Sequence, residues 1–191
     1  MRANVRCVNA YVLVGGRSRR MGESKVELFL DRVVSAARPV FDEVVAVDRL
    51  AVPPPTANRQ PPTIRTLYED PHEHEAPIFG VVRALRDGRG KCFLLAVDYP
   101  LITSEVLRFI RDRGGMPEWN GHPQPLCAVW DTGLLPRIEE RIARGALDLR
   151  GAAETEIISE SELRARFPGE PLLNVNTPEE WERAQRFLAS R

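Results

Sequence analysis

The stretch that decides the fold lies near the N-terminus and reads Leu13-Val14-Gly15-Gly16-Arg17-Ser18-Arg19-Arg20-Met21-Gly22-Glu23-Ser24-Lys25. It follows an apolar run from Val8 to Val14, interrupted only by Asn9, which predicts a fully buried strand. Glycine lets the backbone approach a ligand closely, and cations offset the charge of a polyphosphate. A buried strand that ends in a Gly-rich, cation-rich turn is typical of a phosphate-binding site in an open α/β sheet.

Known phosphate motifs do not explain this stretch. It is not a P-loop, because Gly22 is followed by Glu23 rather than by lysine, and it is not G-x-G-x-x-G. From spacing alone, an ordinary strand-to-helix turn with a solvated basic rim stays open as the alternative. The three arginines that follow the Gly-Gly pair favour phosphate binding.

The composition limits the class of protein. A chain of 191 residues predicts one domain, 1–191, with a sizeable core. Basic and acidic residues balance at 27 each, so no global field attracts nucleic acid or an acidic membrane. Without a visible signal peptide or membrane-spanning run, we expect a cytoplasmic protein. The three cysteines, Cys7, Cys92 and Cys127, lie far apart in apolar runs and are expected to be buried free thiols.

Predicted strands and helices alternate along the chain. Strands are predicted at 43–48, 64–67, 92–97, 126–130 and 156–158, and helices at 26–40, 77–85, 104–113, 134–143 and from 178 to 188. The last helix has a capping box between Thr177 and Glu180. The alternation predicts an α/β fold with a mostly parallel sheet and helices on both faces. The Pro-rich stretch 51–63 and the Gly-rich stretch 114–121 are interpreted as insertions.

Two carboxylates follow predicted strands. Asp98 ends the buried strand 92–97, at the edge where ligands of open sheets lie, and a carboxylate there suits Mg²⁺. The alternative for Asp98 is a turn cap before Pro100. Asp70 could reach the same crevice, and its alternative is an acidic loop residue. The nearby His72-Glu73-His74-Glu75 run has poor spacing for a transition-metal site.

The ordered motifs resemble those of the molybdenum cofactor guanylyltransferases. The opening stretch is similar to the family signature L-A-G-G-x-S-x-R-M-G-x-D-K. Three further segments agree in order, namely Asp70 with Pro77-Ile78-Phe79-Gly80, then Ala96-Val97-Asp98-Tyr99-Pro100, then Asn174-Val175-Asn176-Thr177-Pro178-Glu179. Gln124 before a predicted strand also fits. The resemblance runs from about residue 8 to about residue 188.

The resemblance implies a Rossmann-like three-layer nucleotidyltransferase fold and a defined reaction. Family members transfer the GMP moiety of GTP to the terminal phosphate of molybdopterin, with Mg²⁺, and release pyrophosphate. Molybdoenzymes or other cofactor-biosynthesis proteins are implied as partners.

The family also implies a role for each site residue. The stretch 13–16 (Leu13, Val14, Gly15 and Gly16) holds guanine and phosphates, and Asp70 contacts the nucleotide. Lys25, Arg17 and Arg20 neutralise the triphosphate, with Lys25, Arg20 and Asp98 as the catalytic set. Asp98 binds Mg²⁺, and Asn174 and Asn176 lie toward the pterin.

Departures from the family pattern leave two alternatives open. Ser24 replaces the aspartate before Lys25, and the segment after Lys25 is shorter than is usual. One alternative is therefore a nucleotide-binding or adaptor protein that kept the fold without turnover. The other is a CTP-using cytidylyltransferase or another small-molecule nucleotidyltransferase. Gly15-Gly16 favours guanine, because the cytidylyltransferases typically carry Ala-Gly there.

Overall fold

The apolar run near the N-terminus forms the central strand of a sheet, β1 (Asn9–Leu13). In the computed structural model, the described residues are 9–14, 25–49, 64–153 and 155–189. Ala10, Tyr11 and Val12 are 0% exposed. Alternate side chains of β1 enter two different core clusters, one on each face of the sheet. Burial on both faces explains why the strand is a continuous apolar run rather than an alternating one.

The sheet around β1 is mostly parallel, as predicted. Its described strands lie in the order β3-β2-β1-β4-β7, with β2 at Glu43–Asp48, β3 at Arg65–Tyr68, β4 at Lys91–Ala96 and β7 at Cys127–Asp131. The first four are parallel, and β7 pairs antiparallel with β4. Leu13 pairs with both Val47 and Ala96. The carboxyl ends of β2, β1 and β4 are therefore level with one another.

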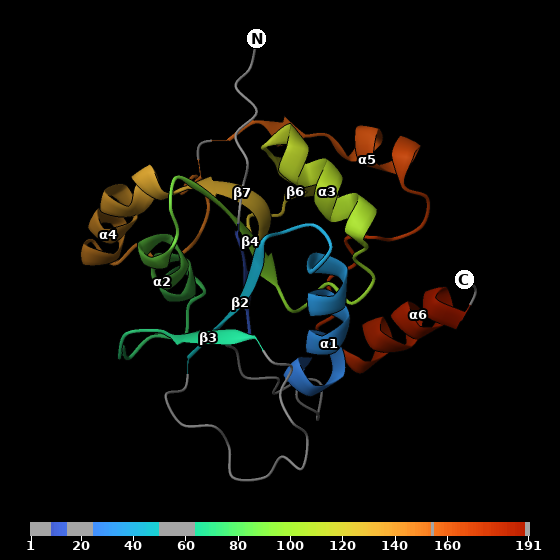
Figure 1. The fold of residues 1–191 in the computed structure, drawn as a ribbon, viewed down its shortest axis with the longest axis horizontal. Helices are drawn as coiled ribbons and strands as arrows, with labels where there is room; N and C mark the ends of the chain where they lie inside the picture. Colours follow the sequence, from blue (N-terminus) through green and yellow to red (C-terminus); the bar gives the residue numbers. More distant parts are fainter. Residues whose placement is uncertain (1–8, 15–24, 50–63, 154, 190–191) are drawn as a thin grey trace.

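Helices cover both faces of this sheet (Figure 1). On one face lie α1 (Lys25–Ala37), α3 (Ser104–Arg113) and α6 (Pro178–Ala189), whose apolar residues belong to one core cluster. On the other face lie α2 (Ile78–Asp87) and α4 (Leu135–Ala143), which a 3₁₀ turn at Thr132–Leu134 precedes. The predicted three-layer α/β architecture is confirmed.

A second, small sheet extends the molecule beyond β7. It has the order β6-β5-β8, with β5 at Met116–Trp119, β6 at His122–Pro123 and β8 at Ile157–Ile158, and α5 (Glu160–Arg166) follows. The stretch 114–121, interpreted from sequence as an insertion, thus contains β5. Trp119 is 1% exposed, and the amide of Val129 on β7 donates to the carbonyl of Gly115 (3.2 Å). This stretch is built into the core, and α5 is an element that the sequence analysis does not predict.

Capping residues set several helix boundaries where they were predicted. The hydroxyl of Thr103 accepts from the amide of Val106 (3.4 Å), and α3 ends before its C-cap Gly114, which has φ +70°.

Cys92 and Cys127 are buried free cysteines, as predicted. Predictions for Cys7, for 51–63, and for Gly15, Gly16, Arg17 and Arg20 lie outside the described residues.

Candidate functional site

The carboxyl end of β1 is held between its two neighbours in the sheet. The carbonyl of Leu13 accepts from the amide of Val97, just after β4 (3.1 Å). The amide of Val14 donates to the carbonyl of Val47 on β2 (3.0 Å). β1 therefore ends at the middle of the carboxyl edge of the sheet. Lys25, the last residue of that stretch, begins α1.

Asp98 lies at this edge, on the β4 side of β1. Its carbonyl accepts a hydrogen bond from the amide of Val175 (2.9 Å), and the Val175 side chain is 0% exposed. Asn174 and Asn176 flank Val175, and the side-chain amide of Asn176 donates to Asn174 Oδ1 (2.8 Å). The fold thus brings together three predicted site residues that are far apart in the sequence.

The predicted capping box fixes this asparagine segment at the start of α6. Glu180 Oε2 accepts from the amides of Asn176 (2.6 Å) and Thr177 (3.0 Å). The hydroxyl of Thr177 accepts in return from the amide of Glu180 (3.3 Å). Reciprocal bonds of this kind satisfy amides that a helix start leaves without partners. They hold the backbone at Asn176 in place next to Asp98.

Tyr99 anchors the other side of the Asp98 turn. Its side chain is 2% exposed, and its hydroxyl donates to Gln124 Oε1 (2.9 Å). The side-chain amide of Gln124 donates through Nε2 to the carbonyls of Trp119 (3.2 Å) and His122 (2.9 Å). Burial raises the pKa of the Tyr99 hydroxyl well above its ordinary value, so it stays a neutral donor. The sequence analysis did not assign Tyr99 a role, and only the Tyr-Pro pair after Asp98 could have pointed to it.

Asp70 lies on the β3 side, and its carboxylate turns to the surface. It is 70% exposed and pairs with the guanidinium of Arg86 on α2. The same guanidinium contacts Glu139 Oε1 on α4 (2.8 Å). These two hydrogen bonds raise the pKa of Arg86, with the bond to Glu139 contributing most. In this structure Asp70 is part of a link between α2 and α4 and is not grouped with Asp98.

The neighbouring Glu69 is the buried carboxylate on this side. Its side chain is 8% exposed, and Oε2 accepts from His72 Nε2 (2.7 Å). His72 is 10% exposed and stacks on Phe79, with ring centroids 3.7 Å apart and an interplanar angle of 14°. The sequence analysis counted Glu69 only as one of several acidic loop residues. Its place directly after β3 was the available signal.

Gly80, in the first turn of α2, fits closely between Glu69 and β1. A Cβ at this position would lie 2.9 Å from Glu69 Oε1 and 3.1 Å from Leu13 Cδ2. Contacts under 3.0 Å force a neighbour to move. Glycine at position 80 therefore permits α2 to approach both the Glu69 carboxylate and the end of β1.

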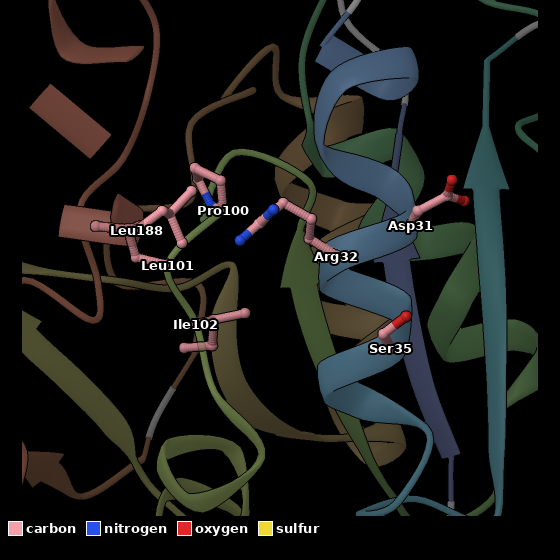
Figure 2. Close-up of a pocket in the computed structure, with 7 residues that line it drawn as sticks. All are labelled: Asp31, Arg32, Ser35, Pro100, Leu101, Ile102 and Leu188. Atoms are coloured by element: carbon pink, nitrogen blue, oxygen red, sulfur yellow. The ribbon is translucent and has the colours of Figure 1, made fainter. Parts of the chain in front are cut away.

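A pocket of about 390 Å³ lies between α1, the segment after Asp98 and the end of α6. In Figure 2, Arg32 points toward Pro100 and Leu101, whereas Asp31 and Ser35 point away from them. None of the described candidate residues lines this pocket. It is therefore separate from the edge where Asp98 and Asn176 meet.

Within 9–14, 25–49, 64–153 and 155–189, no group of three or more His, Cys, Asp and Glu side chains is arranged to hold a metal ion. No described helix has the length and apolar character needed to cross a membrane.

The chain is similar to a known protein family and to several of its members. The family model described as "MobA-like NTP transferase domain" matches residues 10–157. Two proteins named "probable molybdenum cofactor guanylyltransferase" are similar over most of their length. The one from Aquifex aeolicus is 32% identical and covers 91% of this chain and 88% of its own. The one from Pelotomaculum thermopropionicum is 30% identical and covers 91% of this chain and 90% of its own.

A solved structure shows the same fold. The molybdopterin-guanine dinucleotide biosynthesis protein A from Archaeoglobus fulgidus superimposes with a TM-score of 0.77. The two chains are 23% identical, and the match covers 96% of this chain and 100% of the other.

Proposed function

The chain belongs to the family of MobA-like NTP transferase domains, and on that premise we propose that it is a molybdenum cofactor guanylyltransferase. In this proposal it transfers GMP from GTP to the terminal phosphate of molybdopterin cofactor and releases pyrophosphate. The observation that supports it most is the hydrogen bond from the Val175 amide to the Asp98 carbonyl. That bond holds the segment from Asn174 to Asn176 against the backbone of Asp98, just after β4.

The reaction requires positioning and charge neutralisation rather than a protein nucleophile. An oxygen of the acceptor phosphate forms a new bond to the α-phosphorus of GTP. The bond from that phosphorus to the oxygen bridging to the β-phosphate breaks, and pyrophosphate leaves with its electron pair. Enzymes accelerate such transfers by in-line alignment and by stabilising charge on the phosphoryl oxygens.

Each residue of the candidate site has one role in this proposal. Backbone groups of the stretch 13–16 bind the nucleotide, and Arg17, Arg20 and Lys25 offset the charge of its triphosphate. Asp70 contacts the nucleotide, as in the family resemblance. Asn174 and Asn176 face the pterin substrate.

The residues around Asp98 fit Mg²⁺. Magnesium in phosphoryl-transfer sites is usually held by one or two carboxylates, with substrate phosphates and waters completing the shell. Asp98, just after β4, supplies one hard carboxylate oxygen donor of this type. When bound, the ion supplies charge stabilisation on the phosphate oxygens.

A nucleotide panel tests this function. Pyrophosphate release is measured with GTP, CTP, ATP and UTP, with and without Mg²⁺ and molybdopterin cofactor, and binding is measured alongside. We expect GTP-dependent, Mg²⁺-dependent release. In Asp98→Asn, which loses the carboxylate charge, release falls at least about 10³-fold, since a metal contributes several kcal/mol to such a transition state.

Asp112→Asn is the matched control, because Asp112 is an exposed carboxylate on α3 and its loss leaves release unchanged. Product from CTP alone replaces the proposal with a cytidylyltransferase. GTP binding without pyrophosphate from any acceptor supports the adaptor alternative instead. The single domain over 1–191, the cytoplasmic location and contacts with molybdoenzymes are parts of the proposal that need separate tests.

A further inference from the structure

Glu69, His72 and Phe79 form a partly buried cluster that the proposed reaction does not use. One carboxylate oxygen of Glu69 accepts from His72 Nε2, and the His72 ring lies flat on Phe79. Within the described residues, the buried His72 Nδ1 has no hydrogen-bond partner. Burying a polar atom without a partner costs free energy. Such a cost is typical of functional sites, where a ligand supplies the missing partner.

The cluster lies at the same edge of the sheet as Asp98, on the opposite side of β1. The amide of Glu69 donates to the carbonyl of Asp48, the last residue of β2 (2.9 Å). Glu69 Oε1 and Leu13 Cδ2 lie 2.9 Å and 3.1 Å from the same point above Gly80. The strand order β3-β2-β1-β4 puts Glu69 on the β3 side and Asp98 on the β4 side. A nucleotide bound across the end of β1 therefore has one end near Glu69 and the other end near Asp98.

Charge decides which end faces Glu69. A carboxylate repels a triphosphate, and the repulsion is strong where water is excluded. The triphosphate therefore lies on the other side of β1, toward Asp98, where a bound divalent ion would offset its charge. The part of the nucleotide left for Glu69 is uncharged and must offer hydrogen-bond donors. The base meets both requirements.

Guanine has the donor pattern that a carboxylate accepts. Its N1–H and N2–H groups are adjacent and point in the same direction, which suits the two oxygens of one carboxylate. Adenine and cytosine each present an unprotonated ring nitrogen at that edge, and a carboxylate repels its lone pair. We propose that the Glu69 carboxylate, oriented by His72 over Gly80, accepts hydrogen bonds from N1–H and N2–H of guanine and so selects GTP. This inference rests on the proposed function, because it takes the ligand to be a nucleotide.

His72 is a positioning residue in this arrangement. Its Nε2–H group donates a hydrogen bond to Glu69 Oε2. The other carboxylate oxygen, Oε1, then lies toward Gly80 and Leu13. The stacked Phe79 ring restricts rotation of the imidazole. The carboxylate is thus fixed before ligand arrives, and little ordering is needed on binding.

Inosine triphosphate isolates the proposed contact, because it lacks only the 2-amino group of GTP. Dissociation constants for GTP and ITP are measured by calorimetry without acceptor, and kcat/KM for both with acceptor. We expect the wild-type chain to prefer GTP by about tenfold or more, as for the loss of a hydrogen bond to a charged group. In Glu69→Gln the preference falls to about threefold or less, because one acceptor is replaced by a donor. Glu69→Asp, which keeps the charge on a shorter side chain, also lowers the ratio and serves if the glutamine variant does not fold.

Matched variants separate the alternatives. Glu73→Gln removes an exposed carboxylate from the same loop and leaves the GTP/ITP ratio unchanged. His72→Phe keeps an aromatic ring on Phe79 and lowers the ratio with little change in kcat, which a merely structural role does not predict. A ratio that is unchanged in Glu69→Gln, or that falls in Asp70→Asn instead, overturns the inference. If no nucleotide yields pyrophosphate, the proposed function fails, while the dissociation constants still decide the role of Glu69.

Discussion

The two sides of the β1 end are built in different ways. On the β4 side, Asp98 and the segment from Asn174 to Asn176 come from distant parts of the chain and are joined by a main-chain bond from Val175 to Asp98. On the β3 side, Glu69, His72 and Gly80 come from one short segment and are joined through side chains. The proposed metal side needs a carboxylate that substrate phosphates can reach, and the backbone behind Asp98 supplies its support. The proposed base side needs a fixed acceptor with little water around it, so the carboxylate itself is buried.

Among the substitutions that test the difference between the two sides, Gly80→Ala is expected to change the GTP/ITP ratio most. The added methyl group conflicts with Glu69 Oε1, the end of a side chain that can move, so we expect the carboxylate to shift more than the helix. The kcat/KM for GTP and the GTP/ITP ratio then each fall about tenfold, whereas unfolding free energy changes by only about 1 kcal/mol. Steady-state kinetics and thermal melting provide the two measurements.

Gly88→Ala, at the other end of α2, is the matched control for that prediction. Its Cβ would lie 3.2 Å from Thr132 Cγ2 and far from Glu69, so it alters melting only. If both variants lower the GTP/ITP ratio equally, the effect comes from general displacement of α2 and not from the carboxylate.

Tyr99→Phe tests the support of the β4 side. Loss of the hydroxyl leaves Gln124 Oε1 without its donor, which costs about 1 kcal/mol of folding stability. Because Tyr99 adjoins Asp98, we also expect the Mg²⁺ concentration for half-maximal activity to rise about threefold, with the GTP/ITP ratio unchanged. Metal titration of the activity and chemical unfolding measure these effects. An altered base preference in this variant would contradict the separation of the two sides.

The comparison also shows where the sequence was informative. The β1, β2 and α3 boundaries and the capping box at Thr177 follow from local patterns, because burial on both faces, an N-cap hydroxyl and a helix-starting proline leave signs within a few residues. The family resemblance implied roles for Asp98, Asn174 and Asn176 in one site, but the bond between their segments was not predicted, since a bond between distant backbones leaves no local pattern.

The strands β5 and β6 and the role of Glu69 could not be predicted from the local sequence. β5 and β6 are short, and proline and glycine in and around them conceal the strand pattern of Met116–Trp119. Glu69 and Asp70 are adjacent carboxylates, and local sequence does not tell which one turns inward. That depends on His72 and on the space above Gly80, which only the packed structure defines.

The smallest expected effect lies at the opposite edge of the sheet, at Arg65 on the amino end of β3. Its guanidinium contacts Glu43 Oε1 (2.8 Å) and Asp87 Oδ2 (2.8 Å), and these hydrogen bonds lower the pKa of both carboxyl groups. Their stabilisation is therefore complete above the ordinary carboxyl pKa of about 4 and is lost as the pH falls below it. Because Arg65 and Glu43 are 39% and 41% exposed, solvent screening limits the contribution to about 1 kcal/mol or less.

Unfolding of Arg65→Met between pH 7 and pH 3 measures that contribution. We expect the variant to be slightly less stable than the wild-type chain at pH 7 and to approach it at pH 3. Its GTP/ITP ratio stays unchanged, since Arg65 lies at the far end of β3 from Glu69. A lower ratio would mean that the base side is not a local structure.

The division of the site into a metal side and a base side is tested most directly by one paired measurement. Pyrophosphate release and the GTP/ITP ratio of dissociation constants are measured for the wild-type chain, Asp98→Asn and Glu69→Gln under the same conditions. We predict that Asp98→Asn stops release and keeps the ratio, while Glu69→Gln lowers the ratio and keeps measurable release. If Asp98→Asn abolishes the preference for GTP over ITP, or if Glu69→Gln leaves that preference unchanged, this account is contradicted.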